Sequence, residues 1–321
     1  MSLWAAMLPR VSAAGIEIPL ETTVRPRLPV DLDLTLSPLR RGGGDPTTRA
    51  ERAGVWWRAT LTPAGPACAR YAYAAEGGGA VAVAAWGPGA EWCLASAPEL
   101  LGARDSLEGF TPAAGGLVAR LHHAMPGLRI CRSLAVFEAL VPSVLEQKVT
   151  GLEARAAYRG IVRAWGAPAP GPARLRLPPP AALLAVTPYW EWHRFGVERR
   201  RATAIRGAAA CARRIDETTG MAPAAAQRRL RALPGIGPWT AAEVALVALG
   251  DADAVSLADF HLPHLVSWAL AGEPRGSDER MLELLAPYPG HRGRVIRLLA
   301  RSGLWPPRRG PRMPARSFKR Y

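Results

Sequence analysis

The sequence predicts an α+β protein in which an N-terminal antiparallel β-sheet domain precedes a larger all-helical region. The chain has 321 residues, enough for two or three domains with hydrophobic cores of their own. Three short apolar and aromatic runs lie between residues 54 and 86, and Pro- and Gly-containing turns separate them, as expected for strands. From about residue 113, apolar residues instead recur at the period of amphipathic helices.

The N-terminal domain is expected to span residues 1–112. Its strands are predicted at 54–61, 67–74 and 80–86, with another at 30–36, where Val30, Leu32, Leu34 and Leu36 alternate with polar residues. Residues 40–49, rich in Gly, Pro and Thr, are expected to form a turn region. We interpret residues 1–15 as a disordered lead rather than a signal peptide, because no basic segment precedes their apolar stretch.

The helical region is expected to span residues 113–305, and a basic tail follows at 306–321. Its clearest signal is the amphipathic stripe of Phe137, Leu140, Val141, Val144 and Leu145. Pro142 within this stripe is expected to kink the helix or to mark its first turn. Residues 166–180 form a Pro-rich connector. Further helices are predicted at 116–124, 152–165, 181–186, 198–214, 222–233, 238–249, 260–271, 278–286 and 291–303.

Composition excludes several classes of protein. The longest apolar run, residues 80–86, is far shorter than the roughly 20 residues of a transmembrane helix, so no membrane association is expected. The four cysteines are scattered and form no C-x-x-C motif, which argues against a disulfide scaffold, a zinc module and an iron–sulfur cluster. We therefore expect a reducing, cytoplasmic location and no metal site.

The chain is strongly basic, with a net charge of +15. Its only lysines are Lys148 and Lys319, so arginine supplies nearly all of the positive charge. A basic body favours a polyanionic partner such as nucleic acid. A GC-rich coding bias would also produce an arginine-rich, lysine-poor composition, and part of the charge lies in the tail. Charge alone therefore leaves nucleic-acid binding open.

The most informative segment is a turn between two predicted helices. A helix ending near Leu233 meets Pro234-Gly235-Ile236-Gly237, and a second helix opens at Pro238, a residue suited to the first helical position. The glycines permit backbone angles closed to other residues. The N–H groups of such a loop and of the helix start form an anion site suited to a phosphate. Phosphate binding is predicted for Gly235, Ile236, Gly237 and Thr240, and an ordinary corner between two helices is the alternative.

The segment Leu233–Ala241 (LPGIGPWTA) resembles the helix-hairpin-helix of the HhH-GPD DNA glycosylases. These enzymes place an essential aspartate shortly after the second hairpin helix, and Leu257–Leu262 (LADFHL) puts Asp259 there. Upstream, Pro126–Arg129, Phe137–Ala139 and Val144–Val149 resemble the segment that opens the helical core in the 3-methyladenine DNA glycosylase II (AlkA) branch. The resemblance implies an all-helical helix-hairpin-helix glycosylase core of two helical subdomains with a cleft between them.

The resemblance also implies a function, namely a hydrolase of base excision repair. Such a DNA N-glycosylase binds double-stranded DNA that contains damaged bases, excises a flipped-out alkylated purine of the 3-methyladenine type and leaves an abasic site. Members that also cut the backbone carry a lysine at the position of Trp239, so this chain is expected to be monofunctional. The expected protein is a nucleoid-associated monomer in the cytoplasm, with no cofactor beyond a monovalent cation at the hairpin. The alternatives are a glycosylase for another damaged base and a non-catalytic helix-hairpin-helix DNA-binding protein.

Asp259 is the predicted catalytic residue. Taken from the residues alone, it is an acid before an apolar helical stripe, a position where aspartate ordinarily caps the helix. The two roles are compatible, because a carboxylate at a helix start can cap the helix and still face a cleft. Asp251 and Asp253 are rivals, but their place directly after the hairpin helix predicts solvated loop acids.

The predicted substrate pocket contains Trp239, Phe260 and Glu243. Aromatic faces attract a cationic base, which favours the first two, although Trp239 is equally compatible with a core tryptophan that seals the hairpin. Glu243 lies one turn beyond Trp239, where the AlkA branch tends to have an aromatic residue. It is expected either to enter the pocket or, as the favoured alternative, to face solvent. Arg292 opens the last helix and is predicted to hold a second phosphate, with a solvated basic turn as the equal alternative.

Overall fold

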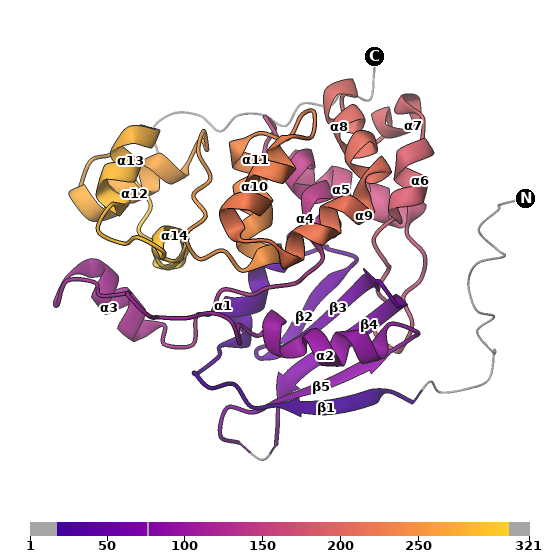
Figure 1. The fold of residues 1–321 in the computed structure, drawn as a ribbon, viewed down its shortest axis with the longest axis horizontal. Helices are drawn as coiled ribbons and strands as arrows, with labels where there is room; N and C mark the ends of the chain where they lie inside the picture. The colour runs from indigo at the N-terminus through magenta and orange to yellow at the C-terminus, as the bar shows by residue number, and fades with distance from the viewer. Residues whose placement is uncertain (1–17, 76, 308–321) are drawn as a thin grey trace, which may run out of the picture.

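The computed structural model describes residues 18–75 and 77–307. Its N-terminal part contains a five-stranded antiparallel sheet with the strand order β1-β5-β4-β3-β2 (Figure 1). The strands are β1 (Leu20–Val24), β2 (Thr48–Arg52), β3 (Val55–Thr62), β4 (Gly65–Tyr73) and β5 (Val81–Trp86). The three predicted strands between residues 54 and 86 correspond to β3, β4 and β5, and the predicted α+β class is confirmed.

The segment predicted as a strand at residues 30–36 is instead the helix α1 (Leu32–Leu36), followed by the 3-10 turn η1 (Ser37–Leu39). The Asp31 carboxylate caps α1 by accepting the N–H of Leu34 at 2.9 Å. Leu32 and Leu36 are four residues apart and both buried. Over so short a stretch, alternating leucines fit both the two-residue period of a strand and the helical period of about 3.6 residues. The capping aspartate and the burial of Leu32 and Leu36 favour the helix. Strands β1 and β2 were not predicted, because their side chains are mostly exposed or half-buried and show no clear apolar alternation.

Each face of the sheet is covered by a different part of the chain. Alternate residues of β4 and β5 form one core with α1 and with α2 (Ala90–Leu100), a helix that the sequence did not predict. On the other face, Trp57 and Trp86 stack with their ring centroids 5.4 Å apart. Ala173, Leu175 and Leu177 of the Pro-rich connector are buried against these tryptophans. The connector is therefore a covering layer of the sheet rather than a loose link between helices.

The remaining helices follow α2 in the chain. They are α3 (Leu117–Ala124), α4 (Val136–Leu145), α5 (Gly151–Trp165), α6 (Ala181–Val186), α7 (Tyr189–His193), α8 (Arg199–Ala210), α9 (Ala212–Asp216), α10 (Pro223–Arg231), α11 (Pro238–Val244), α12 (Leu262–Ala271), α13 (Asp278–Leu285) and α14 (Arg292–Arg301). A 3-10 turn, η2 (Glu217–Gly220), precedes α10, and a π-helical turn, η3 (Ala245–Leu249), continues α11. Pro142 lies well inside α4 and not in its first turn.

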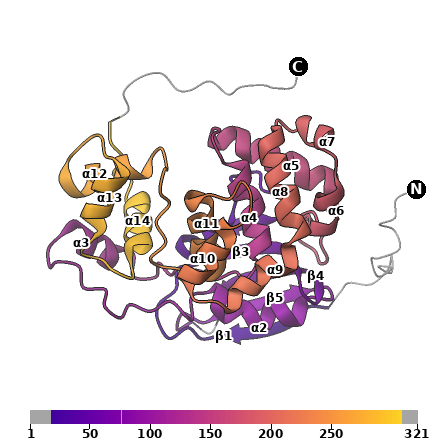
Figure 2. The ribbon, with the colours of Figure 1, turned by 45° about the horizontal axis from the view of Figure 1, so that its top comes forward.

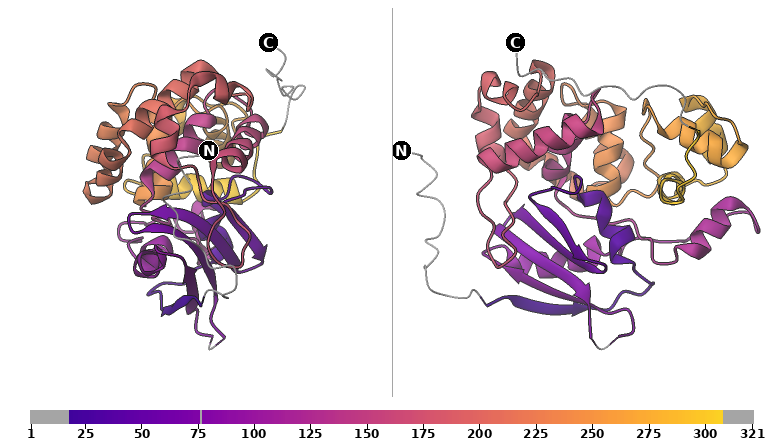
Figure 3. Two further views of the ribbon diagram at one scale, coloured as in Figure 1. Left: turned by 90° about the vertical axis from the view of Figure 1, so that its right-hand side faces the viewer. Right: turned by 180° about the vertical axis from the view of Figure 1, so that it is seen from behind.

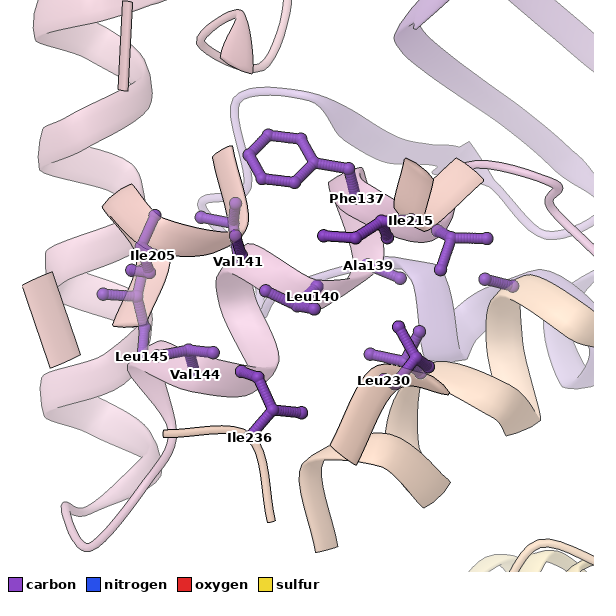
Figure 4. Close-up of a cluster of buried hydrophobic side chains, with 14 of the residues drawn as sticks. Phe137, Ala139, Leu140, Val141, Val144, Leu145, Ile205, Ile215, Leu230 and Ile236 are labelled. Carbon is purple, nitrogen blue, oxygen red and sulfur yellow. The ribbon is translucent and has the colours of Figure 1, made fainter. Parts of the chain in front are cut away.

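The helices form two groups, each with its own hydrophobic core (Figures 1 and 2). Helices α4 to α11 share the larger core, in which the predicted stripe of α4 is central (Figure 4). Helices α12, α13 and α14 form the second core together with α3. Asp259 lies in the chain between α11 of the first group and α12 of the second. The position of the predicted catalytic residue is therefore set by where the two groups meet.

The larger helical group lies against the sheet, as Figure 3 shows from two sides. Glu138 of α4 accepts hydrogen bonds from Arg58 Nη2 at 2.7 Å and from Thr60 Oγ1 at 2.6 Å, both on β3. This mostly buried ion pair fixes the helix that carries the core stripe onto the sheet domain.

Two predictions concern the ends of the chain. The predicted lead (residues 1–15) lies outside the described residues, as does residue 308 onward of the predicted tail. Within the described ranges, no helix has both the length and the apolar character needed to cross a bilayer.

Candidate active site

The hairpin joins α10 to α11 through a turn that depends on its first glycine. Gly235 has a φ of +84°, in the left-handed region that favours glycine. A Cβ atom at this residue would lie 2.7 Å from the Cβ of Ala204 on α8. Gly237 is different, because its φ is −90° and an added Cβ would meet nothing within 4 Å. The first glycine is therefore needed by the fold, whereas the second leaves an open approach to the backbone.

The predicted phosphate ligands differ in what they can offer. The Ile236 side chain is only 4% exposed and lies among the core side chains beside α4 (Figure 4). Its N–H donates to the carbonyl of Leu233 at 3.1 Å, so this amide is already satisfied. Thr240 is 1% exposed, which leaves its hydroxyl in the interior. The backbone N–H groups of Gly235, Gly237 and Thr240, by contrast, have no acceptor in the part of the chain that the structure describes. Phosphate binding at the hairpin stays a prediction, now centred on these backbone amides.

Gln147 secures the hairpin from the end of α4, and the sequence did not single it out. Its Nε2 donates to the carbonyl of Gly235 at 3.0 Å and to Thr240 Oγ1 at 2.9 Å. The next residue, Lys148, is exposed and has a φ of +55°, a left-handed conformation that is strained for a side chain other than glycine. Gln147 belongs to the segment Val144–Val149, whose resemblance to the AlkA branch was the one signal in the sequence that could have pointed to this residue.

Asp259 uses both of its carboxylate oxygens. Oδ1 accepts the N–H groups of His261 at 2.7 Å and of Leu262 at 2.9 Å, which satisfies two backbone donors where α12 begins. Oδ2 accepts the indole N–H of Trp239 at 2.8 Å. This bond joins α11 of the first helical group to the entry of α12 in the second. The N-cap residue of α12 is His261, so Asp259 is not the N-cap itself but accepts two backbone N–H groups at the helix start. The catalytic role stays a prediction that this geometry accommodates.

The backbone that presents Asp259 is held in an unfavourable conformation. Ala258 has a φ of +63°, which costs an alanine on the order of 1–3 kcal/mol. Its N–H donates to Asp278 Oδ2 at 2.7 Å, at the start of α13. Strain of this kind persists only where the surroundings impose it, and it concentrates at functional sites.

Phe260 does not lie in the interior. Its side chain is 78% exposed, and its ring centroid lies 5.0 Å from that of His261 and 6.1 Å from that of His264. His261 in turn faces the half-exposed Trp305 at 6.5 Å. Phe260 is thus part of an exposed aromatic group beside Asp259, so any contact with a base would occur at the protein surface. Among the described side chains, no group of three or more His, Cys, Asp or Glu residues is arranged to hold a metal ion.

Glu243 turns inward, contrary to the favoured solvent-facing orientation. Its Oε1 accepts the hydroxyl of Ser256 at 2.5 Å, across to the loop that carries Asp259. Burial raises the pKa of Glu243, and the negative charges of Glu146 and Asp259 act in the same direction. The Ser256 hydrogen bond and the positive charge of Arg41 oppose this shift without cancelling it.

Arg292 is occupied by an ion pair. Its guanidinium donates from Nε to Asp253 Oδ1 at 2.8 Å and from Nη2 to Asp253 Oδ2. Burial alone would raise the pKa of Asp253, but the hydrogen bonds and charge of Arg292 outweigh burial and lower it. Asp251 is only 9% exposed and accepts from Gln227 Nε2 at 2.8 Å. The prediction of a solvated loop acid was therefore wrong for Asp251, whereas Asp253 is partly exposed but ion-paired. A phosphate at Arg292 would have to compete with Asp253.

Comparisons with known proteins bear on the fold. No family model matches the sequence, and no curated protein matches it. Among solved structures, a 3-methyladenine DNA glycosylase from Archaeoglobus fulgidus superposes with a TM-score of 0.72 at 20% identity, covering 87% of this chain and 97% of that one. An 8-oxoguanine glycosylase/lyase from Clostridium acetobutylicum, solved with DNA, gives 0.65 at 12% identity over 89% of this chain and 98% of that one. A third structure, MBOgg1 with a DNA ligand, gives 0.68 at 14% identity over 90% and 95%.

These similarities extend over the sheet as well as the helices, since each covers most of both chains. At such low identity they bear on the fold alone, and they do not choose between the substrates that those proteins' names describe. Together with the hairpin and the aspartate beyond it, they confirm the resemblance drawn from sequence at the level of the fold: this chain has the fold of the HhH-GPD DNA glycosylases.

Proposed function

We propose that this protein is a monofunctional DNA glycosylase of base excision repair that hydrolyses the N-glycosidic bond of flipped-out alkylated purines of the 3-methyladenine type. The observation that carries the proposal is the setting of Asp259. Its carboxylate is fixed by two backbone amides and by the Trp239 indole. It follows a helical hairpin whose Gly235 and Gly237 amides have no acceptor among the described residues. A carboxylate held in this way is preorganised for charge stabilisation.

In the proposed reaction the duplex is anchored by phosphates at the Gly235 and Gly237 amides, and by arginines around them. The damaged nucleotide leaves the base stack at a cost of a few kcal/mol, which is smallest for a damaged pair. Cleavage of the glycosidic bond builds positive charge on the sugar. Asp259 stabilises this charge and orients the water that attacks C1′. An alkylated purine is already cationic, so it departs without a strong general acid.

Hydrolysis should stop at the abasic site. Strand cleavage by this class of enzyme needs an amine that attacks the sugar and forms a Schiff base. Trp239 occupies the position where such an amine would stand, and Lys148 is the only lysine before the C-terminal tail. We therefore propose that the protein has no lyase activity.

The second candidate is a glycosylase for a different damaged base. Glu243 favours it, because a carboxyl group is found where the AlkA branch tends to have an aromatic residue, and it faces the interior beside the Asp259 loop. Solved proteins named as 8-oxoguanine glycosylases also share the fold.

The decisive measurement is base release from a methylated duplex, with 3-methyladenine and 7-methylguanine separated by chromatography. Asp259→Asn keeps an oxygen that can accept the His261 and Leu262 amides but removes the charge, and we expect excision to fall by at least about 10²-fold. The matched control is Asp31→Asn, which changes an aspartate that accepts a backbone N–H at the start of a helix in the sheet domain. Full excision by Asp259→Asn would refute the catalytic assignment of Asp259, whereas DNA binding without base release by the unmodified protein would indicate a non-catalytic DNA-binding protein.

Strand integrity tests the monofunctional part of the proposal separately. We expect the excised duplex to be nicked only after treatment with alkali. A covalent protein–DNA adduct trapped by borohydride, or nicking without alkali, would refute it.

A further inference from the structure

The loop that carries Asp259 is attached to α11 at two points, one helical turn apart. Trp239 Nε1 donates to Asp259 Oδ2 at 2.8 Å, and Ser256 Oγ donates to Glu243 Oε1 at 2.5 Å. Residues four apart on a helix lie on one face with their Cβ atoms about 6 Å from each other. The carboxyl group of Glu243 is therefore held one helical turn from Trp239, the residue that donates to the predicted catalytic aspartate.

The two oxygens of Glu243 are not equivalent. Oε1 is taken by the Ser256 hydroxyl, whereas Oε2 has no hydrogen-bond partner among residues 18–75 and 77–307. The residue is partly exposed, and Oε2 is not among the buried side-chain atoms of the described residues that lack a hydrogen-bond partner, so Oε2 is not sealed into the core. Ser256 thereby fixes the group and leaves one oxygen for a ligand.

The surroundings of Glu243 favour its neutral form. Burial raises the pKa of Glu243, as do Glu146 at the end of α4 and Asp259 on the loop. The opposing groups are the Ser256 hydroxyl and Arg41, whose charge is shared with Glu146 at 3.7 Å. In glycosidic chemistry a carboxyl group whose pKa is raised by its surroundings acts as the general acid.

Resting on the proposed function, we propose that Glu243 is a general acid that extends excision to uncharged purines, by protonating a ring nitrogen of the departing base from Oε2 while Asp259 stabilises the sugar. A neutral purine leaves poorly because it must carry away the electron pair of the glycosidic bond as an anion. A proton delivered to the ring removes that charge. A cationic alkylated purine needs no such proton, so Glu243 would matter for one class of substrate and much less for the other.

The proposed step balances as follows. The bond between C1′ and N9 breaks, and its electron pair leaves with the base, which gains the Glu243 proton and departs neutral. Water then adds to C1′ and loses a proton to solvent. Glu243 regains its proton from solvent, which restores the resting state.

The test compares two duplexes of identical sequence, one with a single 7-methylguanine, which is cationic, and one with a single hypoxanthine, which is neutral. For Glu243→Gln we expect the single-turnover rate of hypoxanthine release to fall by about 10²-fold or more, because a general acid typically accelerates a reaction by at least that factor. We expect a much smaller loss for 7-methylguanine. Asp216→Asn is the matched control, because Asp216 in α9 is another carboxyl whose pKa burial raises, and this variant should affect both substrates equally.

The pH profile separates acid catalysis from a structural role. Because the protonated form of Glu243 is the active one, the rate of hypoxanthine release should fall as pH rises through the pKa of Glu243. This falling limb of the pH–rate curve should be absent in Glu243→Gln. Ser256→Ala removes a bond that favours the charged form, so the limb should move to higher pH. Glu146→Gln removes a negative charge, so the limb should move to lower pH.

Several results would overturn the inference. Equal losses on the two substrates in Glu243→Gln would indicate that the residue only positions the loop, and no loss on either would exclude it from the reaction. Release of 7-methylguanine but no hypoxanthine by the unmodified protein would refute the inference and leave the proposed function intact. Release of neither base would refute both. If Glu243→Gln failed to fold, unmoved limbs in Ser256→Ala and Glu146→Gln would be decisive against it.

Discussion

The hydrogen bond between the Trp239 indole and Asp259 contributes to the rate of base excision, and the substitution Trp239→Phe measures that contribution. Phenylalanine retains an aromatic ring of similar shape in the helix but cannot donate to Oδ2, which accepts the indole N–H at 2.8 Å. Asp259 keeps its two backbone donors at Oδ1. The carboxylate therefore stays near its place but loses the contact that sets the direction of its second oxygen.

The magnitude follows from the chemistry of that bond. A hydrogen bond to a charged group contributes about 1.5–3 kcal/mol. If all of this is expressed in the transition state, the rate falls by about 10- to 160-fold, at 1.36 kcal/mol per tenfold. We expect a smaller effect than in Asp259→Asn, because the charge itself remains.

The assay is single-turnover release of 7-methylguanine with enzyme in excess, accompanied by thermal unfolding. Trp56→Phe is the matched control, because the Trp56 indole donates to Asp33 Oδ1 at 2.6 Å within the sheet domain. Both variants lose an indole–carboxylate bond, but only Trp239→Phe should slow excision. An unchanged rate in Trp239→Phe, or equal slowing in the two variants, would refute the view that the indole orients the catalytic carboxylate.

Two further predictions concern stability. Gly235→Ala should lower the free energy of unfolding by at least about 1–3 kcal/mol, because its φ of +84° is unfavourable for alanine and the new Cβ would meet Ala204. Gly237→Ala, with a φ of −90° and open space around it, should stay within about 0.5 kcal/mol, and equal losses in urea titrations would contradict this account. The lowered pKa of Asp253 stabilises the fold above the ordinary aspartate value of about 3.9, and this contribution is lost as pH falls through the folded-state pKa. Since the pair with Arg292 is partly exposed, Asp253→Asn should cost no more than about 1 kcal/mol near neutral pH. That difference should vanish in strong acid, and a loss that persisted there would indicate another role.

Local signals in the sequence identified most helices and the hairpin. Pro238 at the first helical position and the paired glycines describe the turn without reference to the rest of the chain. The same kind of local signal was ambiguous at residues 30–36, where five helical residues are too few for a period to be recognised. The edge strands β1 and β2 were missed because strand pairing, and not an apolar pattern, defines them.

The sequence by itself determined the α+β class, the hairpin and the aspartate placed after it, because each depends on spacing along the chain. Only the tertiary structure decided which side chains hold the hairpin and Asp259 in place. Gln147 reaches the hairpin from 88 residues away, and Trp239 meets Asp259 where two helical groups come together. The tertiary structure also decided that Glu243 accepts a hydrogen bond from Ser256 and that Phe260 is exposed. Side-chain direction and burial depend on which elements pack together, and that packing is settled by contacts between residues far apart in the sequence.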